Sequence, residues 1–167
     1  MNVKTKTVAT LGIATTLALV LSYVESLFPP LWAAVPAIKM GLPNIVIVFL
    51  LYRTSPKWAI AVSLLRVFLV AFLFGSAMTL AYSTAGALLS ILTMMGLKHT
   101  QHFTPVGVSV AGAVMHNVGQ ILVAVWLLRT VEIGYYLIVL TITGTLAGIL
   151  IGLLGSYVIK RTDSGIL

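Results

Sequence analysis

The chain has 167 residues, of which 60% are hydrophobic and 8% are charged, and its mean hydropathy is +1.13. A soluble domain of this size has too little interior to hide so much apolar surface, so the composition indicates an integral membrane protein without a soluble head. The net charge of +7 does not indicate a nucleic-acid-binding protein, because the positive residues lie singly near the ends of apolar segments. The absence of cysteine excludes disulfides and thiolate chemistry.

The first apolar run begins like a secretory signal peptide, with Lys4 and Lys6 ahead of it. It continues from Val8 to Phe28 without a clear small-residue cleavage site, and further apolar segments follow it. We therefore interpret this run as a first transmembrane helix and not as a removed leader.

Prolines, glycines and charged residues divide the chain into apolar segments. Because a membrane-spanning helix needs about 20 apolar residues, a chain of 167 residues has room for about six spans. The sequence predicts a single all-α transmembrane domain over 1–167, with helices near 6–28, 40–53, 57–74, 77–97, 105–128 and 134–160.

The distribution of lysine and arginine predicts the orientation of this bundle. If the N-terminus is cytoplasmic, only Lys39 and Arg129 fall in outer loops. The inner segments then hold the larger set, namely Lys4, Lys6, Arg53, Lys57, Lys98, Lys160 and Arg161. Positive residues concentrate on the cytoplasmic side of membrane proteins. We expect both termini to be cytoplasmic, in a multi-pass protein of a bacterial cytoplasmic membrane.

The outer connection 29–43 is apolar, proline-rich and too broken to form one helix. The predicted helix that follows it is short. Two interpretations are open for this loop. It folds back as a lid over an outward-facing cavity, or it lies at the membrane interface, where Trp32 anchors it.

Small residues recur at helical spacing on two segments. Gly144, Gly148 and Gly152 form a continuous GxxxGxxxG pattern, and Ala14 and Ala18 form an AxxxA pattern on the first helix. Such faces let helix backbones approach closely inside a membrane. Their spacing fits packing within the chain, and it also fits docking onto a separate membrane subunit.

Arg66 lies in the middle of an apolar segment, and the whole chain has only three carboxylates to neutralise it. A charge at bilayer depth costs at least about 2.5 kcal/mol, so it normally faces a protein interior or a ligand. An anionic ligand is one candidate partner for Arg66. Glu25, near the outer end of the first helix, is the rival candidate.

Other polar residues are expected at a similar depth. His116 and Gln120 share one face of the fifth helix, and Tyr82 and Ser83 lie in the outer half of the fourth. These groups act either as hydrogen bonds between helices or as ligand contacts around the arginine. We predict a substrate site that draws six side chains from four helices: Arg66, His116, Asn117, Gln120, Asn44 and Tyr82.

The sequence lacks the groups that autonomous catalysis requires. Its single aspartate is Asp163, near the C-terminus, and no carboxylates are paired, whereas magnesium-dependent prenyl or phosphoryl transfer needs clustered acidic ligands. No nucleotide-binding loop or serine nucleophile motif occurs. We therefore expect no catalytic residues, no metal site and no cofactor, and any ATP-driven activity would need a partner.

Five motifs resemble those of one membrane-protein family. They are GLPNIV at 41–46, LLR at 64–66, FGS at 74–76, YSTAG at 82–86 and GVSVAGAVMHNVGQ at 107–120. The chain resembles the Gx transporter family, which is often labelled heptaprenyl diphosphate synthase component I, over residues of roughly 5 to 160. Pro43 departs from the pattern, which has a small non-proline residue there.

The resemblance implies a fold similar to that of the substrate-binding (S) subunits of energy-coupling factor transporters. Those subunits have six helices, an outward-facing site beneath the first loop, and a small-residue face that contacts a coupling membrane protein with ATPases. By this resemblance Ala14 and Ala18 would form the partner contact. The function would then be uptake of a small anionic or amphipathic metabolite.

The family label implies a different function. It describes a non-catalytic membrane component that works beside a separate polyprenyl diphosphate synthase subunit, in the synthesis of isoprenoid chains. Both hypotheses make the chain a non-enzymatic binding subunit. A purely structural role in a larger membrane assembly would fit the glycine pattern, but it would leave Arg66 without a reason.

Overall fold

The computed structural model describes residues 3–27, 41–129 and 131–162, and within these ranges every regular element is a helix. The elements are α1 (Val3–Leu27), α2 (Asn44–Arg53), α3 (Pro56–Phe74), α4 (Ala77–Thr100), α5 (Pro105–Leu128), the 3₁₀ turn η1 (Val131–Tyr135) and α6 (Tyr136–Arg161). The predicted all-α class is therefore confirmed. The loop 29–43 lies mostly outside the described residues, so its two interpretations stay predictions.

Five helices, α1, α3, α4, α5 and α6, are long and apolar enough to cross a membrane. The sixth, α2, has 10 residues, which corresponds to about 15 Å at 1.5 Å per residue. A hydrocarbon core of about 30 Å is twice as thick. Of the six predicted helices, five are therefore long enough to span a membrane, and the one predicted near 40–53 is observed as the shorter Asn44–Arg53.

Local sequence explains where the helices begin and end. Ser76 and Thr104 accept hydrogen bonds from backbone N–H groups in the first turns of α4 and α5, as N-cap residues do. Pro56 and Pro105 occupy first-turn positions, where a missing N–H costs nothing.

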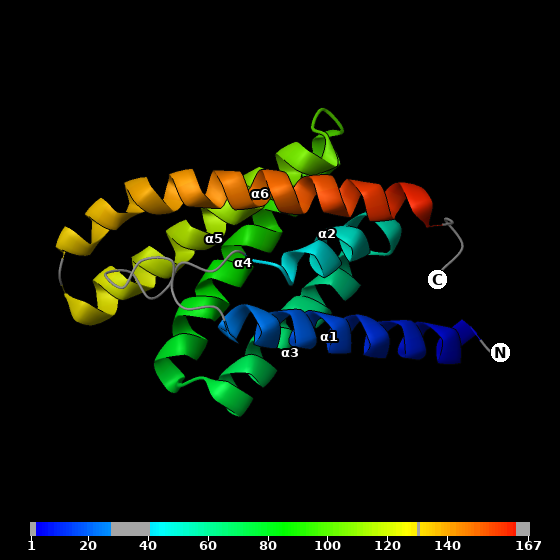
Figure 1. The fold of residues 1–167 in the computed structure, drawn as a ribbon, viewed down its shortest axis with the longest axis horizontal. Coiled ribbons are helices and arrows are strands. Elements are labelled where there is room, and N and C mark those ends of the chain that lie inside the picture. The colour runs from blue at the N-terminus through cyan, green and yellow to red at the C-terminus, as the bar shows by residue number, and fades with distance from the viewer. Residues whose placement is uncertain (1–2, 28–40, 130, 163–167) are drawn as a thin grey trace.

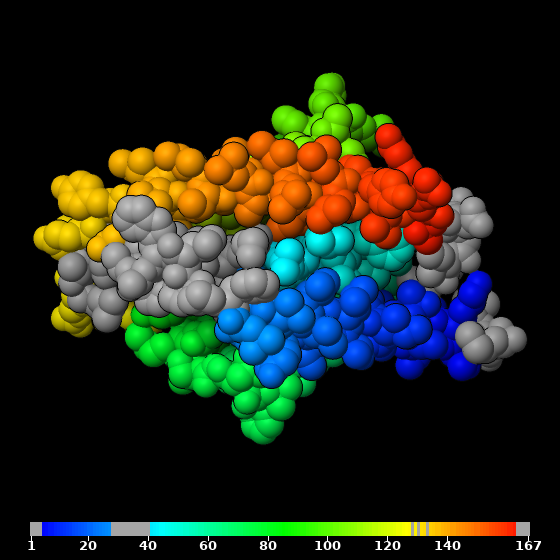
Figure 2. Space-filling view, viewed as in Figure 1, coloured from blue at the N-terminus to red at the C-terminus, as the bar shows by residue number. Residues whose placement is uncertain are grey.

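The helices form a bundle in which the short α2 is central (Figure 1). α4, α5 and α6 pack in sequence against one another, α2 lies against α6 and α3, and α1 lies against α3 and α2. Figure 2 shows α1 and α6 on either side of α2. α1 begins and α6 ends at the same end of the molecule, which we call the terminal end.

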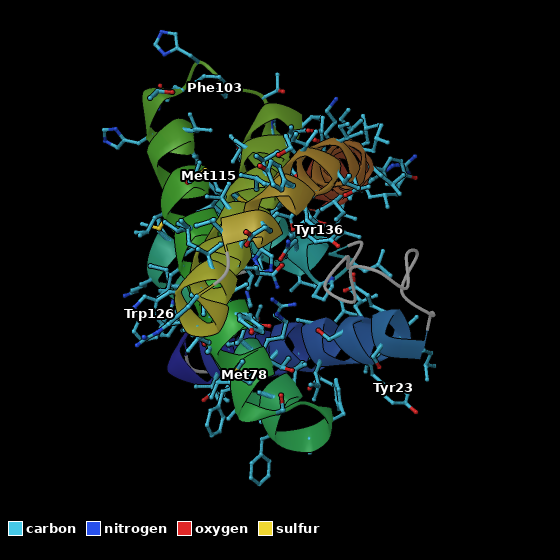
Figure 3. The ribbon with its side chains drawn as sticks, turned by 90° about the vertical axis from the view of Figure 1, so that its left-hand side faces the viewer. Tyr23, Met78, Phe103, Met115, Trp126 and Tyr136 are labelled. Carbon is cyan, nitrogen blue, oxygen red and sulfur yellow. The ribbon has the colours of Figure 1, made fainter. Side chains whose placement is uncertain are left out.

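The core of the bundle is built around α2. Five of its apolar side chains are almost completely buried, at 5% exposure or less: Val46, Ile47, Val48, Leu50 and Leu51. By contrast, large apolar side chains cover the outer faces of the longer helices. Phe72 and Trp126 are 78% and 77% exposed, and Figure 3 shows Trp126 and Tyr23 at the margins of the bundle. Such an apolar exterior suits contact with lipid.

The glycines of α6 bring that helix close to α5. A Cβ atom added at Gly148 would lie 2.6 Å from the Cα of Val110. A Cβ atom added at Gly152 would lie 2.7 Å from the Cα of Val106. The GxxxGxxxG pattern therefore packs α6 within this chain. Gly144 takes part in the same approach, and its added Cβ would lie 2.6 Å from Asn117 Nδ2.

The two alanines of the AxxxA pattern are also used within the chain. Ala14 is 9% exposed and Ala18 is fully buried, and both belong to the apolar cluster around α2. In this structure they have almost no surface to offer a second subunit. Intramolecular packing, the alternative reading of this pattern, is what their burial supports.

Candidate anion-binding cavity

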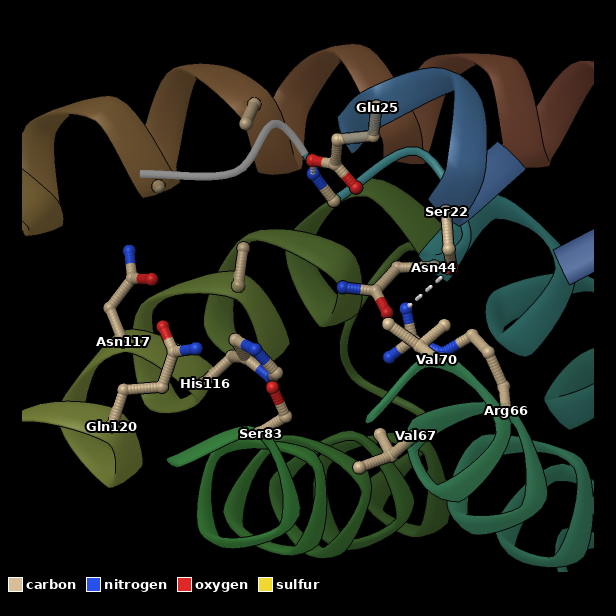
Figure 4. A pocket seen from close by; sticks show the side chains of 14 residues that line it. Ser22, Glu25, Asn44, Arg66, Val67, Val70, Ser83, His116, Asn117 and Gln120 are labelled. Atoms are coloured by element: carbon tan, nitrogen blue, oxygen red, sulfur yellow. Dashed lines mark hydrogen bonds between the residues drawn. The ribbon is translucent and has the colours of Figure 1, made fainter. Parts of the chain in front are cut away.

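A cavity of about 60 Å³ lies between the helices, in the half of the bundle away from the terminal end. Figure 4 shows it lined by the last turns of α1, the start of α2 and the middle parts of the longer helices. The lining residues are Ser22, Glu25, Gly41, Asn44, Arg66, Val67, Val70, Ser83, Ala113, His116, Asn117, Gln120, Gly144 and Ala147.

The size of the cavity limits what it can hold. One water needs about 10–15 Å³ by this measure, so the space fits a few waters or one small polar group. Pockets for whole metabolites are larger, about 300–1,000 Å³. The cavity therefore suits the headgroup of a ligand whose remaining part lies elsewhere.

Five of the six predicted site residues line this cavity: Asn44, Arg66, His116, Asn117 and Gln120. Tyr82 does not line it, and its neighbour Ser83 does. Successive residues of an α-helix point about 100° apart, and of this pair only Ser83 lines the cavity, although His116 and Asn117 on α5 both do. Hydropathy does not reveal which residue of α4 faces the cavity, because both lie in an apolar helix that carries polar residues.

The guanidinium of Arg66 enters the cavity with few partners (Figure 4). Its Nη1 donates to Ser22 Oγ at 3.5 Å, which is longer than a typical hydrogen bond of about 3 Å. Its Nε is buried and has no hydrogen-bond partner among the described residues. A buried donor without an acceptor costs about 1–3 kcal/mol. An anion in the cavity would remove this cost.

Glu25 lies in the same cavity, is 8% exposed, and interacts electrostatically with Arg66. Its carboxylate also accepts a hydrogen bond from the backbone N–H of Gly41. Glu25 thus joins the end of α1 to the residues that begin α2. The rival role predicted for Glu25, as the counter-ion of Arg66, is compatible with a ligand site because both groups line one space.

The N-terminus of α2 is a second source of positive potential in the cavity. Gly41 and Asn44, which line it, belong to the turn that starts this helix, and no side chain caps the helix there. Gly41 has φ +76°, a conformation that favours glycine. A helix N-terminus carries a partial positive charge and attracts anions. The shortness of α2 is what brings this end inside the bundle.

The polar row on α5 fits against its neighbours because two glycines make room for it. A Cβ atom added at Gly86 on α4 would lie 2.8 Å from His116 O and 3.0 Å from Gln120 Cγ. Asn117 Nδ2 passes Gly144 and donates to the carbonyl of Leu140 on α6 at 2.7 Å. Asn117 therefore acts partly as a hydrogen bond between helices.

Sequence reasoning left Ser22, Gly41 and Gly144 out of the site. Ser22 lies three residues before Glu25, so the two share a face of α1, and that spacing was the available signal. Gly144 was assigned to packing alone. Its place in the cavity wall depends on which helix it faces, and the spacing of the glycines does not contain this information.

With this geometry established, comparison with known proteins identifies the family. The family model for heptaprenyl diphosphate synthase component I matches residues 14–158. The chain belongs to the heptaprenyl diphosphate synthase component I family. The match includes every lining residue of the cavity. No curated protein and no solved structure matches the chain, so the expected similarity to S subunits gains no support from this comparison.

Proposed function

We propose that the protein is a non-catalytic membrane component of polyprenyl diphosphate synthesis, and that the Arg66 cavity holds the diphosphate head of a prenyl chain. The observation that carries the proposal is the guanidinium of Arg66, which lies in the cavity with one long hydrogen bond and a buried Nε that lacks a partner. Arginine is well suited to phosphate, because its planar fork can donate two parallel hydrogen bonds.

The surroundings of Arg66 support a phosphate head rather than a large polar metabolite. The cavity of about 60 Å³ has room for a small group. The positive end of α2 adds attraction for an anion. Gln120 and His116, on the opposite side of the cavity, provide polar groups that can orient the head (Figure 4).

The remainder of such a ligand is a hydrocarbon chain, and the exterior of the bundle suits it. Five long apolar helices expose large aliphatic and aromatic side chains. A prenyl tail that stays in the bilayer, with its head in the cavity, avoids exposure of apolar surface to water. This division of the ligand explains why a small cavity is sufficient.

The chemical step is assigned to a separate subunit. Prenyl elongation requires magnesium held by clustered carboxylates, and the chain has three acidic residues in total. The family description names a component of the synthase, which is consistent with a partner that supplies the acidic ligands. The membrane component would present or receive the diphosphate for that partner.

Direct binding tests the proposal. Purified protein in detergent is titrated with farnesyl diphosphate, with farnesol as the probe that lacks phosphate. We expect Arg66→Ala to weaken diphosphate binding roughly 10- to 100-fold, because a hydrogen bond to a charged group contributes about 1.5–3 kcal/mol. Arg66→Lys should bind the diphosphate with an affinity between those of the wild type and Arg66→Ala, since lysine keeps the charge and loses the planar fork of donors.

Lys57→Ala is the matched control for this titration. It removes one exposed positive charge from the same helix, outside the cavity. Equal affinity of the Arg66→Ala and wild-type proteins for farnesyl diphosphate would refute the proposed site. A decrease with Lys57→Ala as large as with Arg66→Ala would indicate unspecific attraction of anions.

The subunit role has its own test. If the protein serves a synthase, it should co-purify with a soluble polyprenyl synthase, and deletion of its gene should change the length of quinone side chains. The uptake hypothesis predicts the reverse pattern, namely unchanged quinones and co-purification with a coupling protein and ATPases. That pattern would contradict the role in synthesis.

A further inference from the structure

The helix α1 is attached to the rest of the bundle along one narrow face. Within residues 5–27 the buried residues of this face are Ala14, Ala18, Ser22 and Glu25. Their spacing of three or four residues places them on one side of the helix, while Ile13 on another side is 70% exposed. α1 therefore meets its neighbours mainly through small or polar side chains, which bury less apolar area than the large side chains of α2 do.

The last part of this face is polar and forms one wall of the cavity. Ser22 and Glu25 are the lining residues that come from α1. Arg66 on α3 donates the 3.5 Å hydrogen bond to Ser22 and interacts electrostatically with Glu25. Nearby, the rings of Tyr23 on α1 and Phe74 on α3 meet edge to face, with centroids 5.9 Å apart. These contacts between α1 and α3 are made by the ends of side chains, which can separate without disturbing either helix.

Three other seams between helices beside the cavity are closed more firmly. α4 and α5 approach so closely that a Cβ atom added at Gly119 would lie 2.7 Å from Ala85 O. α5 and α6 approach in the same way at Gly148. α3 and α4 follow one another in the chain, and only Gly75 and Ser76 separate them. A hydrocarbon chain could pass between these helices only if backbones in contact moved apart or a short connection gave way.

A diphosphate with a hydrocarbon tail needs a seam that can open. Its head requires polar partners and its tail an apolar environment, so the bound molecule must pass between two helices. We propose that it passes between α1 and α3, and that α1 moves away from α3 to admit the head to the cavity. The first part of the tail then lies in this seam, which we call the α1 gate. This proposal rests on the proposed function, because it gives the route of the ligand proposed there.

The cavity wall on α3 suits this route. Val67 and Val70 line the cavity on the same helix as Arg66 (Figure 4). Val70 lies one helical turn after Arg66, so the two share a face of α3. A head held by Arg66 would therefore have apolar side chains beside the part of the ligand that joins head and tail.

A reversible cross-link tests this route. The chain has no cysteine, so Tyr23→Cys with Phe74→Cys places one pair of thiols across the α1 gate, at residues outside the cavity lining. A short linker joins the pair through disulfides, and a reductant releases it. The control pair is Phe68→Cys with Phe72→Cys, because these rings stack within α3 with centroids 6.3 Å apart. A link between them does not involve α1.

Binding and release of radiolabelled farnesyl diphosphate are measured for each protein in lipid nanodiscs, before linking, after linking and after reduction. We expect the link across the α1 gate to slow both processes about tenfold or more, because it hinders a conformational change that association requires. Reduction should restore both rates in the same sample, which excludes a folding defect. The link within α3 should leave both rates unchanged.

Cysteine accessibility provides an independent measurement of the movement. Ala18 on the contact face of α1 and Ala87 on α4 are almost completely buried, at 0% and 3% exposure. If α1 moves away from α3, a small thiol reagent should react faster with Ala18→Cys than with Ala87→Cys. Equal reaction rates would contradict the movement.

Unchanged binding and release in the protein linked across the α1 gate would overturn the inference. A loss of binding in Arg66→Ala would then still support the diphosphate site, and only the route would fall. If the wild type binds no farnesyl diphosphate, the proposed function fails, and the route fails with it.

Discussion

The bundle contains cations in two regions, and they are held differently. At the terminal end, Arg53 Nη2 donates to the carbonyl of Ile159 in the last turn of α6, and Lys98 Nζ donates to that of Leu51 in the last turn of α2. In the cavity, Arg66 makes one long hydrogen bond to Ser22. The Nε atoms of Arg53 and Arg66 both lack hydrogen-bond partners among the described residues. The two arginines therefore differ in the contacts of their terminal nitrogens.

The comparison separates structural cations from the cation for which we propose a binding role. Carbonyls at a helix C-terminus carry partial negative charge, so Arg53 and Lys98 stabilise the ends of α6 and α2. Lys98 also lies 5.1 Å from the ring centroid of Tyr52, a favourable cation–π distance. Arg66 donates to the Ser22 hydroxyl and not to a helix-terminal carbonyl, and it faces a cavity. Glu25 interacts with this charge, and the proposed anionic ligand would give it a second charged partner.

The largest expected difference between the regions is in stability. Arg53→Met should lower the free energy of unfolding by about 1.5–3 kcal/mol, because a charged donor to a helix-terminal carbonyl is lost. Arg66→Met combined with Glu25→Gln should leave stability unchanged or raise it, because it removes a buried charge with few hydrogen bonds together with the carboxylate that interacts with it. Thermal unfolding in detergent, followed by tryptophan fluorescence, measures both variants. Equal destabilisation by Arg53→Met and by the double variant would remove the distinction between the two regions.

A smaller difference is expected between two glycines of α6. Gly152→Ala should cost about 1–3 kcal/mol, because the new Cβ would meet the backbone of Val106. Gly144→Ala should cost less, because its Cβ would meet the amide end of the Asn117 side chain, which can move. Gly12→Ala is the control, since nothing lies within 4 Å of its added Cβ. A greater loss of stability for Gly144→Ala than for Gly152→Ala would contradict the expectation that the Asn117 side chain can move to make room.

The smallest effect is expected at Asn117. Its amide donates to Leu140 O, and a hydrogen bond between membrane helices contributes about 0.6 kcal/mol on average. Asn117→Ala should therefore reduce stability slightly and change diphosphate affinity less than Gln120→Ala does. The same titration measures both variants. A larger affinity loss for Asn117→Ala would return this residue to the ligand contacts predicted from its sequence position.

Much of the fold follows from the sequence because hydropathy and helix breakers act locally. Pro56, Ser76 and Pro105 mark helix starts within a few residues of the predicted positions. The start of α2 does not follow from the sequence, because a run of apolar residues with a proline at position 43 does not reveal whether the helix starts before or after it.

The site was predicted where polar residues stand out in apolar helices, as Arg66 and the row from His116 to Gln120 do. What the sequence could not supply is the rotation of each helix. Rotation decides that Ser83 and not Tyr82 faces the cavity, and that Ala14 and Ala18 join the apolar cluster around α2. The direction in which the N-terminus of α2 points also depends on packing between helices that are distant in sequence.

Native mass spectrometry of the protein released gently from its membranes is the most direct test of the central claim. Wild-type protein and the Lys57→Gln variant should each retain a bound molecule whose mass and fragments identify a prenyl diphosphate, and Arg66→Gln should lose it. Retention of the same molecule by Arg66→Gln, or a bound molecule without phosphate in the wild type, would contradict the assignment of the Arg66 cavity to a diphosphate head.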